Sequence, residues 1–171
     1  MSRYSGVEEL TASHVLDRFD CGSDAQTIWL RKHALQSHNG HDNRVRVVRR
    51  LEDDLVVGYY ALRTGSVLRG DAPVRLTKGG GGYADIGVII LTRLGVDLSE
   101  QRNGLGRALV VDSLRTIMKV AEVVGFRALF IHAEDDEAKQ FYLKLAQFEE
   151  SPLDSLQLML LVKDIEKAAR Q

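Results

Sequence analysis

Two glycines in the stretch QRNGLG, residues 101–106, stand where they could expose a row of backbone amides to a phosphate. A very apolar segment precedes them and an amphipathic pattern follows, which indicates a strand turning into a helix. The first amides of a helix have no partner within it and lie at the positive end of the helix dipole, so this turn suits an anion. We therefore expect Gly104 and Gly106 to let a phosphate approach, with polar and cationic contacts from Gln101, Arg102 and Arg107.

The elements that would position this turn alternate in the second half of the chain. Strand-like, helical and strand-like patterns follow one another, and the helix that opens at Gly104 ends at Gly125. This alternation predicts a strand-helix-strand crossover with its ligand site at the strand ends. The expected strands are 83–96, 128–132 and 156–162, and the expected helices are 104–124, 134–146 with acidic residues in its first turn, and a charged tail.

The first half reads as a short opening strand, two helices and a hairpin. Ser23 is a candidate N-cap for the second helix, in which Trp29, Leu30, His33 and Ala34 recur at helical spacing and are expected in the core. Four glycines at 79–82 cannot pack a core, so we expect a mobile loop there. The expected helices are 11–19 and 23–37, and the expected hairpin pairs 44–50 with 55–67.

Composition describes an ordinary globular chain. Its 171 residues, 44% of them hydrophobic, predict a single α/β domain over residues 1–171. Neither a secretory signal pattern nor an apolar run of membrane-spanning length is present, so we expect a cytoplasmic protein that does not associate with a membrane. The lone Cys21 is expected to be a small buried hydrophobe, and His38 and His41 have no further ligands near them, so we expect no metal.

Charge is close to balanced overall, with a formal net charge of -1, but residues 44–78 hold more bases than acids. Such a region can contact phosphates locally, or it can be the solvated face of a strand; the charges alone leave both interpretations open. The bases are Arg44, Arg46, Arg49, Arg50, Arg63, Arg69, Arg75 and Lys78.

A family resemblance rests on the turn and on four longer stretches. QRNGLG resembles the Gln/Arg-x-x-Gly-x-Gly/Ala signature of the GNAT superfamily of N-acetyltransferases, whose members bind the acetyl-CoA pyrophosphate there. Residues 21–35, 56–67, 91–110 and 121–160 together resemble the toxin branch of toxin-antitoxin modules, which acetylates aminoacyl-tRNA. Two departures are Gln147, where the family usually has glycine before Phe148, and the glycine run, where relatives carry a proline-containing segment.

The resemblance implies a GNAT fold with a mixed, splayed sheet, acetyl-CoA as donor, and Tyr142 as the phenol that protonates the leaving thiolate. It implies aminoacyl-tRNA and a ribbon-helix-helix antitoxin as partners, and a homodimer. Arg93, Arg75, Lys78 and Arg69 are expected to bind tRNA phosphates. The residues expected at acetyl-CoA are Leu94, Gly95, Val96, Gln101, Arg102, Asn103, Gly104, Leu105, Gly106 and Arg107.

Three functions stay open at this point. The first is acetylation of the α-amine of aminoacyl-tRNA, which would block translation; its pKa near 8 leaves a useful neutral fraction at pH 7, whereas a lysine amine would need a base. The second is acetylation of a small amine or a protein N-terminus. The third is a non-catalytic module that binds acetyl-CoA as a structural ligand.

Overall fold

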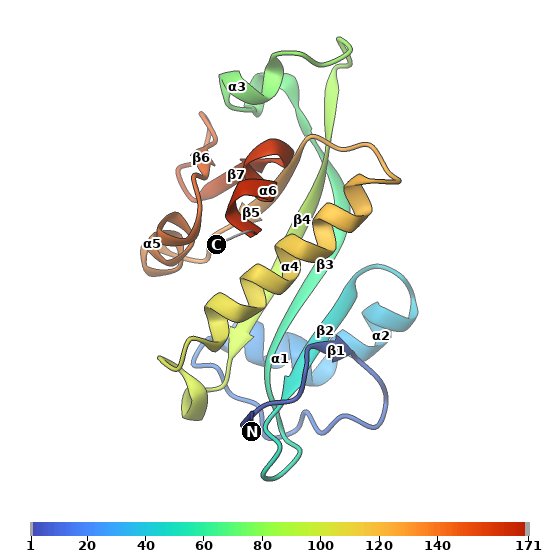
Figure 1. Cartoon of the computed structure of the whole chain (residues 1–171), viewed down its shortest axis with the longest axis vertical. Coiled ribbons are helices and arrows are strands. Elements are labelled where there is room, and N and C mark those ends of the chain that lie inside the picture. The colour runs from blue at the N-terminus through green and yellow to red at the C-terminus, as the bar shows by residue number, and fades with distance from the viewer. Residues whose placement is uncertain (1, 170–171) are drawn as a thin grey trace. The chain divides into compact units, whose positions relative to one another are not determined.

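A computed structural model describes the backbone of residues 2–169 and the side chains of residues 2–167. Within that part of the chain, seven strands form one mixed sheet in the order β1-β2-β3-β4-β5-β7-β6 (Figure 1). The α/β class expected from the sequence is therefore confirmed. The strands are β1 (Glu8–Glu9), β2 (Arg44–Arg49), β3 (Val56–Leu68), β4 (Asp85–Val96), β5 (Ala128–His132), β6 (Glu149–Glu150) and β7 (Gln157–Leu161).

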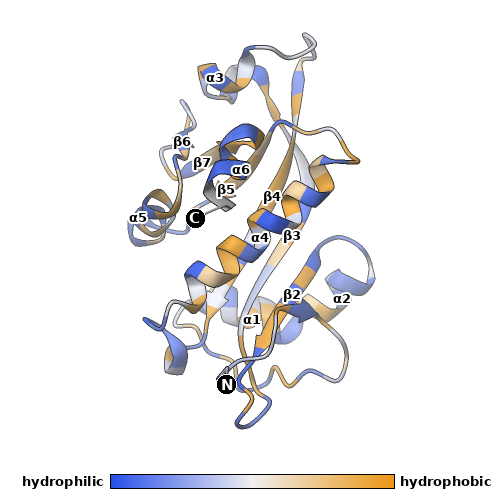
Figure 2. Ribbon diagram, in the orientation of Figure 1, coloured by the Kyte–Doolittle hydropathy of each residue, from blue (hydrophilic) through white to orange (hydrophobic). Residues whose placement is uncertain are grey.

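The chain divides into two compact units. The first contains residues up to 63 together with 92–112, and the second contains 64–91 together with the residues from 113 onward. β3, β4 and the long helix α4 (Leu105–Ala121) each run from one unit into the other. α4 alternates hydrophobic and hydrophilic residues along its length, as its predicted amphipathic pattern requires (Figure 2).

The first unit is built on antiparallel pairing of β1 with β2 and of β2 with β3. Two short helices, α1 (Asp24–Lys32) and α2 (Ala34–Asn39), replace the single helix expected over 23–37. Ser23 caps α1 as predicted, because its side chain accepts a hydrogen bond from the Gln26 amide. Leu30 and Ala34 lie in the core, but the chain breaks helical geometry at His33, whose side chain is exposed. The core prediction was therefore wrong for His33.

The helix expected over 11–19 is absent: within the described chain those residues form turns and an isolated bridge. The Thr11 amide donates to Nδ1 of His14 at 2.9 Å, and the other ring nitrogen of His14 lies 3.0 Å from a Glu8 carboxylate oxygen. Val15 then pairs with Leu55 in a parallel bridge. Side-chain hydrogen bonds and this long-range pairing thus satisfy the backbone in place of helical bonds.

In the second unit, β4 pairs parallel with β5, from Val88 opposite Ala128 to Leu91 opposite Ile131. Because α4 connects these two strands in the chain, the predicted strand-helix-strand crossover is confirmed. β7 pairs antiparallel with both β5 and β6. The remaining helices are α3 (Val74–Thr77), which sequence patterns did not indicate, α5 (Asp136–Leu145) and α6 (Val162–Ala169); short 3-10 turns, η1 (Arg69–Asp71) and η2 (Leu98–Glu100), complete the elements.

Candidate cofactor and acceptor sites

The turn between β4 and α4 has the form that an anion site needs. Residues 101–104 are exposed, and the α4 ladder begins with the Ala108 amide donating to the Gly104 carbonyl at 3.0 Å. Gly104 adopts φ +81°, and a Cβ added there would meet no protein atom within 4 Å. No protein atom therefore occupies the space in which a side chain at Gly104 would lie, just before the first amides of α4, which have no partner within the helix. Arg102 is also left-handed, with φ 67°, which is uncommon for a residue with a long side chain.

The side chain of Gln101 ties the turn to two neighbouring backbone segments of the first unit. Its side-chain amide donates to the Cys21 carbonyl at 3.0 Å and to the Val96 carbonyl at 2.9 Å. Both N–H groups of its side chain are thereby used within the first unit, so the hydrogen-bond donor that Gln101 could present to a ligand is its backbone amide. Cys21 is half-buried rather than fully buried as expected, and its thiol lies 3.3 Å from the Thr27 hydroxyl.

A buried carboxylate supports the same turn, and the sequence patterns did not reveal it. Glu100 is 0% exposed and accepts two hydrogen bonds from Arg3, at 2.7 and 3.0 Å, while Arg50 lies 3.9 Å away. Nearby, the Asp97 side chain caps η2 by accepting from the Ser99 amide at 3.0 Å. Arg3 is 97 positions from Glu100, so no local spacing could have indicated the pair.

The end of β4 supplies the strand expected along the pantetheine arm. Gly95 is buried, and a Cβ there would lie 3.0 Å from the Tyr59 ring and 3.3 Å from both Phe19 and Cys21. A larger residue at this position would have to displace these neighbours, so close packing favours glycine. Leu94 and Val96, which point to the other face of the strand, are only half-buried. Asn103 and Arg107 are exposed, Gly106 is half-buried and Leu105 is buried at the first position of α4.

Tyr142 lies on α5, in the second unit. The ring is 7% exposed, with edge-on contacts to Phe141 at 5.2 Å and Phe148 at 6.1 Å between centroids. Burial, and secondarily the negative charge of Glu134, raises the pKa of the phenol well above its ordinary value. Within residues 2–167 its hydroxyl has no hydrogen-bond partner. It is thus a phenol that stays protonated and whose proton is not committed elsewhere.

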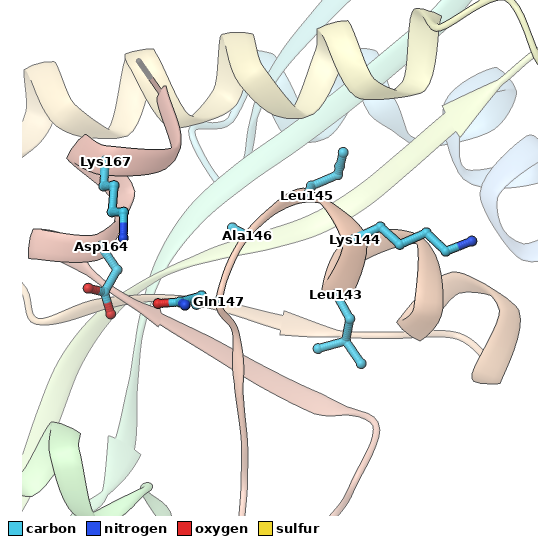
Figure 3. Close-up of a pocket in the computed structure, with 7 residues that line it drawn as sticks. All are labelled: Leu143, Lys144, Leu145, Ala146, Gln147, Asp164 and Lys167. Atoms are coloured by element: carbon cyan, nitrogen blue, oxygen red, sulfur yellow. The ribbon is translucent and has the colours of Figure 1, made fainter. Parts of the chain in front are cut away.

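Gln147 follows the C-terminus of α5. The helix ends at Leu145, and the capping residue Ala146 is extended, with φ -160° and ψ 170°. A left-handed glycine is therefore not needed at this end, which explains how the chain tolerates Gln147 where the resemblance led us to expect glycine. Gln147 extends toward Asp164 of α6 across a pocket of about 250 Å³ that also includes Lys144 and Lys167 (Figure 3).

The cations expected to bind tRNA differ in their freedom to do so. Arg69 donates to the carbonyls of Thr77 and Tyr83, and Arg75 pairs with Asp164 at 3.0 Å. Lys78 lines a groove of about 510 Å³ together with three further cations of the second unit, Arg75, Arg127 and Lys163. Arg93, in the first unit, has its guanidinium 5.3 Å above the ring of Trp29.

The arginines of β2 are largely neutralised by neighbouring acids. Arg44 pairs with Glu9 at 2.8 Å, Arg49 with Glu8 at 2.5 Å, and Arg46 with Asp112 at 3.5 Å. The basic stretch at residues 44–78 was expected either to contact phosphates or to form the solvated face of a strand. For β2 the ion pairs fit the second interpretation. The positive charges of Arg44, Arg46 and Arg49 are therefore balanced within the first unit.

The described residues show neither a metal-ligand cluster nor a membrane-spanning helix. Within residues 2–167, no cluster of three His, Cys, Asp or Glu side chains could hold a metal ion. No helix of the described chain is both long and apolar enough to cross a bilayer.

Comparison with known proteins shows that this chain is similar to a named toxin over nearly its whole length. The tRNA-acetylating toxin of Mycobacterium tuberculosis is 41% identical over 165 residues, which cover 96% of each protein. This chain belongs to the family of tRNA-acetylating toxins. The family resemblance inferred from QRNGLG and the four longer stretches is thereby confirmed. No family model matches the chain.

Solved structures of similar toxins share the fold of this family member. A Tyr-to-Phe mutant of KacT is 28% identical, with a TM-score of 0.89 over 97% of this chain and 99% of that one. AtaT in complex with acetyl-methionyl-tRNA is also 28% identical, with a TM-score of 0.86 over 96% and 98%. Further structures contain AtaT with acetyl-CoA and with its antitoxin AtaR. The GNAT fold predicted from the sequence is therefore confirmed.

Proposed function

We propose that this protein is a toxin that transfers the acetyl group of acetyl-CoA to the α-amine of an aminoacyl-tRNA and thereby blocks translation. The observation that carries the proposal is the turn at residues 101–106, whose first four residues are exposed and whose Gly104, with φ +81°, has no side chain that could shield the first amides of α4 from a diphosphate. The 41% identical relative is named for the same activity, and AtaT has been solved with acetyl-methionyl-tRNA.

In this proposal the turn and the end of β4 hold the donor. The amides of Gly104, Leu105 and Gly106 bind the pyrophosphate, with Arg102, Asn103 and Arg107 exposed at its rim. Gln101 acts by fixing the turn, because its side-chain donors are already used. The backbone of Leu94, Gly95 and Val96 hydrogen-bonds the pantetheine arm. We also propose that both units act as one acetyltransferase domain spanning residues 1–171, since β3, β4 and α4 are shared between them.

The chemical step needs one proton donor from the chain. The amine nitrogen attacks the thioester carbonyl, the C–S bond breaks, and the Tyr142 phenol gives its proton to the departing thiolate. The attacking nitrogen becomes positively charged and loses one proton to water, and the Tyr142 phenolate takes one proton back from water, so that the phenol is restored and the products are an amide and a neutral thiol. A raised phenol pKa keeps Tyr142 protonated before the reaction, and a free α-amine with pKa near 8 needs no dedicated base at neutral pH.

The proposal extends to the partners of the protein and to its location. We propose that a ribbon-helix-helix antitoxin neutralises the protein, that it forms a homodimer, and that it works in the cytoplasm, where aminoacyl-tRNA is found. The complexes of AtaT with AtaR support an antitoxin partner. Lys78 and Arg93 are the leading contacts for tRNA phosphates, while Arg69 and Arg75 would contribute through donors left over from their internal bonds.

The test is incubation of the purified protein with labelled acetyl-CoA and total charged tRNA. We expect label on the RNA fraction that is released as N-acetyl amino acid when the ester is hydrolysed, and little label with Tyr142→Phe. RNA deacylated beforehand is the control and should remain unlabelled. Label on protein or on small amines alone would reject the proposal in favour of another acceptor, and an absence of turnover would favour a binding module.

A further inference from the structure

Arg93 is held in an unusual way for a surface cation. The carbon at the centre of its guanidinium lies over the indole of Trp29, 5.3 Å from the ring centroid, and Nη1 is 3.5 Å from the side-chain oxygen of Gln26. Within the described residues it has no carboxylate partner. The arginines of β2 and Arg75 are all ion-paired, so the charge of Arg93 stands out as uncompensated.

The indole beneath Arg93 is itself packed against a buried ring. Trp29 stacks on Tyr59, with centroids 6.1 Å apart and an interplanar angle of 13°. Tyr59 is fully buried, and its hydroxyl donates to the Gln26 backbone carbonyl at 2.7 Å. Gln26 therefore contacts the phenol at one end of the stack and the guanidinium at the other. A planar cation fixed on an aromatic face loses little conformational entropy when it binds an anion.

The position of Arg93 along β4 indicates which anion it meets. The pyrophosphate is expected at the turn after Val96, and the pantetheine arm along 94–96, so residue 93 lies on the side of the arm where the thioester ends. Neither the thioester nor the neutral α-amine carries a negative charge. The acceptor's nearest anion is the phosphodiester that joins its terminal nucleoside to the rest of the RNA.

We propose that Arg93, positioned by Trp29 and Gln26, binds the phosphodiester of the 3′-terminal nucleotide of the acceptor RNA. The inference rests on the proposed function, because it requires an aminoacylated RNA as substrate. Arg93 is then a binding residue for the acceptor, and Trp29 is a positioning residue that acts through it. Loss of the charge should weaken use of the RNA and leave the donor unaffected.

The decisive experiment uses a charged minihelix whose last phosphodiester is replaced by a neutral methylphosphonate. With the parent protein, we expect this replacement to lower kcat/KM about tenfold or more, the loss expected for a charge-assisted hydrogen bond. With Arg93→Gln the unmodified minihelix should show a similar loss, and the methylphosphonate should add little further. Equal effects of the methylphosphonate in parent and Arg93→Gln would overturn the proposal.

Matched variants separate binding from folding and from general charge. Lys32→Gln removes one exposed positive charge from α1 and should change kcat/KM less than twofold; a loss equal to that of Arg93→Gln would overturn the proposal. Trp29→Phe keeps an aromatic face and should retain most activity, whereas Trp29→Leu should reproduce the loss and abolish the methylphosphonate effect. Acetyl-CoA affinity should stay unchanged in Arg93→Gln, which excludes the donor's 3′-phosphate as the anion.

Failure of this inference differs from failure of the proposed function. If the parent protein acetylates the charged minihelix and Arg93→Gln does so equally well, the inference alone is rejected. If the parent does not acetylate any aminoacylated RNA, the proposed function is rejected first and the assignment of Arg93 with it.

Discussion

Replacement of Gly104 by alanine tests the assignment of the turn most directly. Gly104 has φ +81° with no protein atom within 4 Å of an added Cβ, so Gly104→Ala creates no clash inside the protein. The cost to the free protein is limited to the left-handed backbone, about 1–2 kcal/mol for a residue with a Cβ. For a chain of this length that corresponds to a fall in Tm of roughly 2–8 °C.

The cost to donor binding should be larger than the cost to stability. The new methyl group would occupy the space through which a phosphate reaches the first amides of α4. Loss of a hydrogen bond to a charged group is worth about 1.5–3 kcal/mol, so the Kd for acetyl-CoA should rise roughly 10-fold to 150-fold. Calorimetric titration with acetyl-CoA at a temperature well below Tm measures this change.

Gly79 supplies a matched control. It has φ +75° and likewise no atom within 4 Å of an added Cβ, but it lies in the glycine run. Gly79→Ala should lower Tm by a similar amount and leave the acetyl-CoA affinity unchanged. If both variants weaken the donor equally, or if Gly104→Ala binds acetyl-CoA like the parent, the turn is not the diphosphate site and the reasoning fails.

The remaining predictions concern the phenol, the support of the turn and a buried imidazole. Tyr142→Phe should lower kcat about 10²-fold to 10⁴-fold with unchanged acetyl-CoA affinity. The difference between the tyrosinate absorbance titrations of the parent and of Tyr142→Phe isolates the Tyr142 phenol, which should ionise above pH 10. Ionisation of this phenol at the ordinary pKa of tyrosine would contradict the burial argument. Gln101→Ala should reduce the free energy of unfolding by about 1 kcal/mol and weaken acetyl-CoA binding, because two carbonyls lose their donor; unchanged chemical denaturation would contradict this role. His38 accepts a hydrogen bond from the Val45 amide, and its pKa is lowered mainly by burial and secondly by the charge of Arg44. As the pH falls below about 6.5, the imidazole takes up a proton in the unfolded chain before it does so in the folded protein, so the free energy of unfolding should decrease. His38→Asn should flatten this pH dependence, measured by urea denaturation.

Local signals in the sequence predicted much of the fold. The Ser23 cap and the glycines of the turn depend on neighbouring residues, and the structure has Ser23 capping α1 and Gly104 at the start of α4. The expected helix over 11–19 failed because its backbone is satisfied by His14 and by pairing of Val15 with Leu55. Those contacts depend on residues up to 40 positions apart, which helical spacing does not register.

In the candidate site, too, contacts between residues far apart in the sequence could not be predicted. Glu100 beneath the turn is held by Arg3, and the charge of Arg75 is balanced by Asp164, 89 positions further along the chain. A count of bases along the sequence could not reveal either pair. The contact of Arg93 with Trp29 could not be predicted either, because the two residues lie in separate segments of the sequence, the end of β4 and helix α1.

The run of four glycines is fastened on both sides by guanidinium groups. Arg127 donates to the Lys78 carbonyl at 2.7 Å just before the run, and Arg69 donates to the Tyr83 carbonyl at 3.0 Å just after it. With both ends tethered, lengthening the run by a few glycines should cost little, because closure entropy grows only slowly with length. The length of this segment can therefore change at little energetic cost, while Arg127 and Arg69 fix the positions at which it begins and ends.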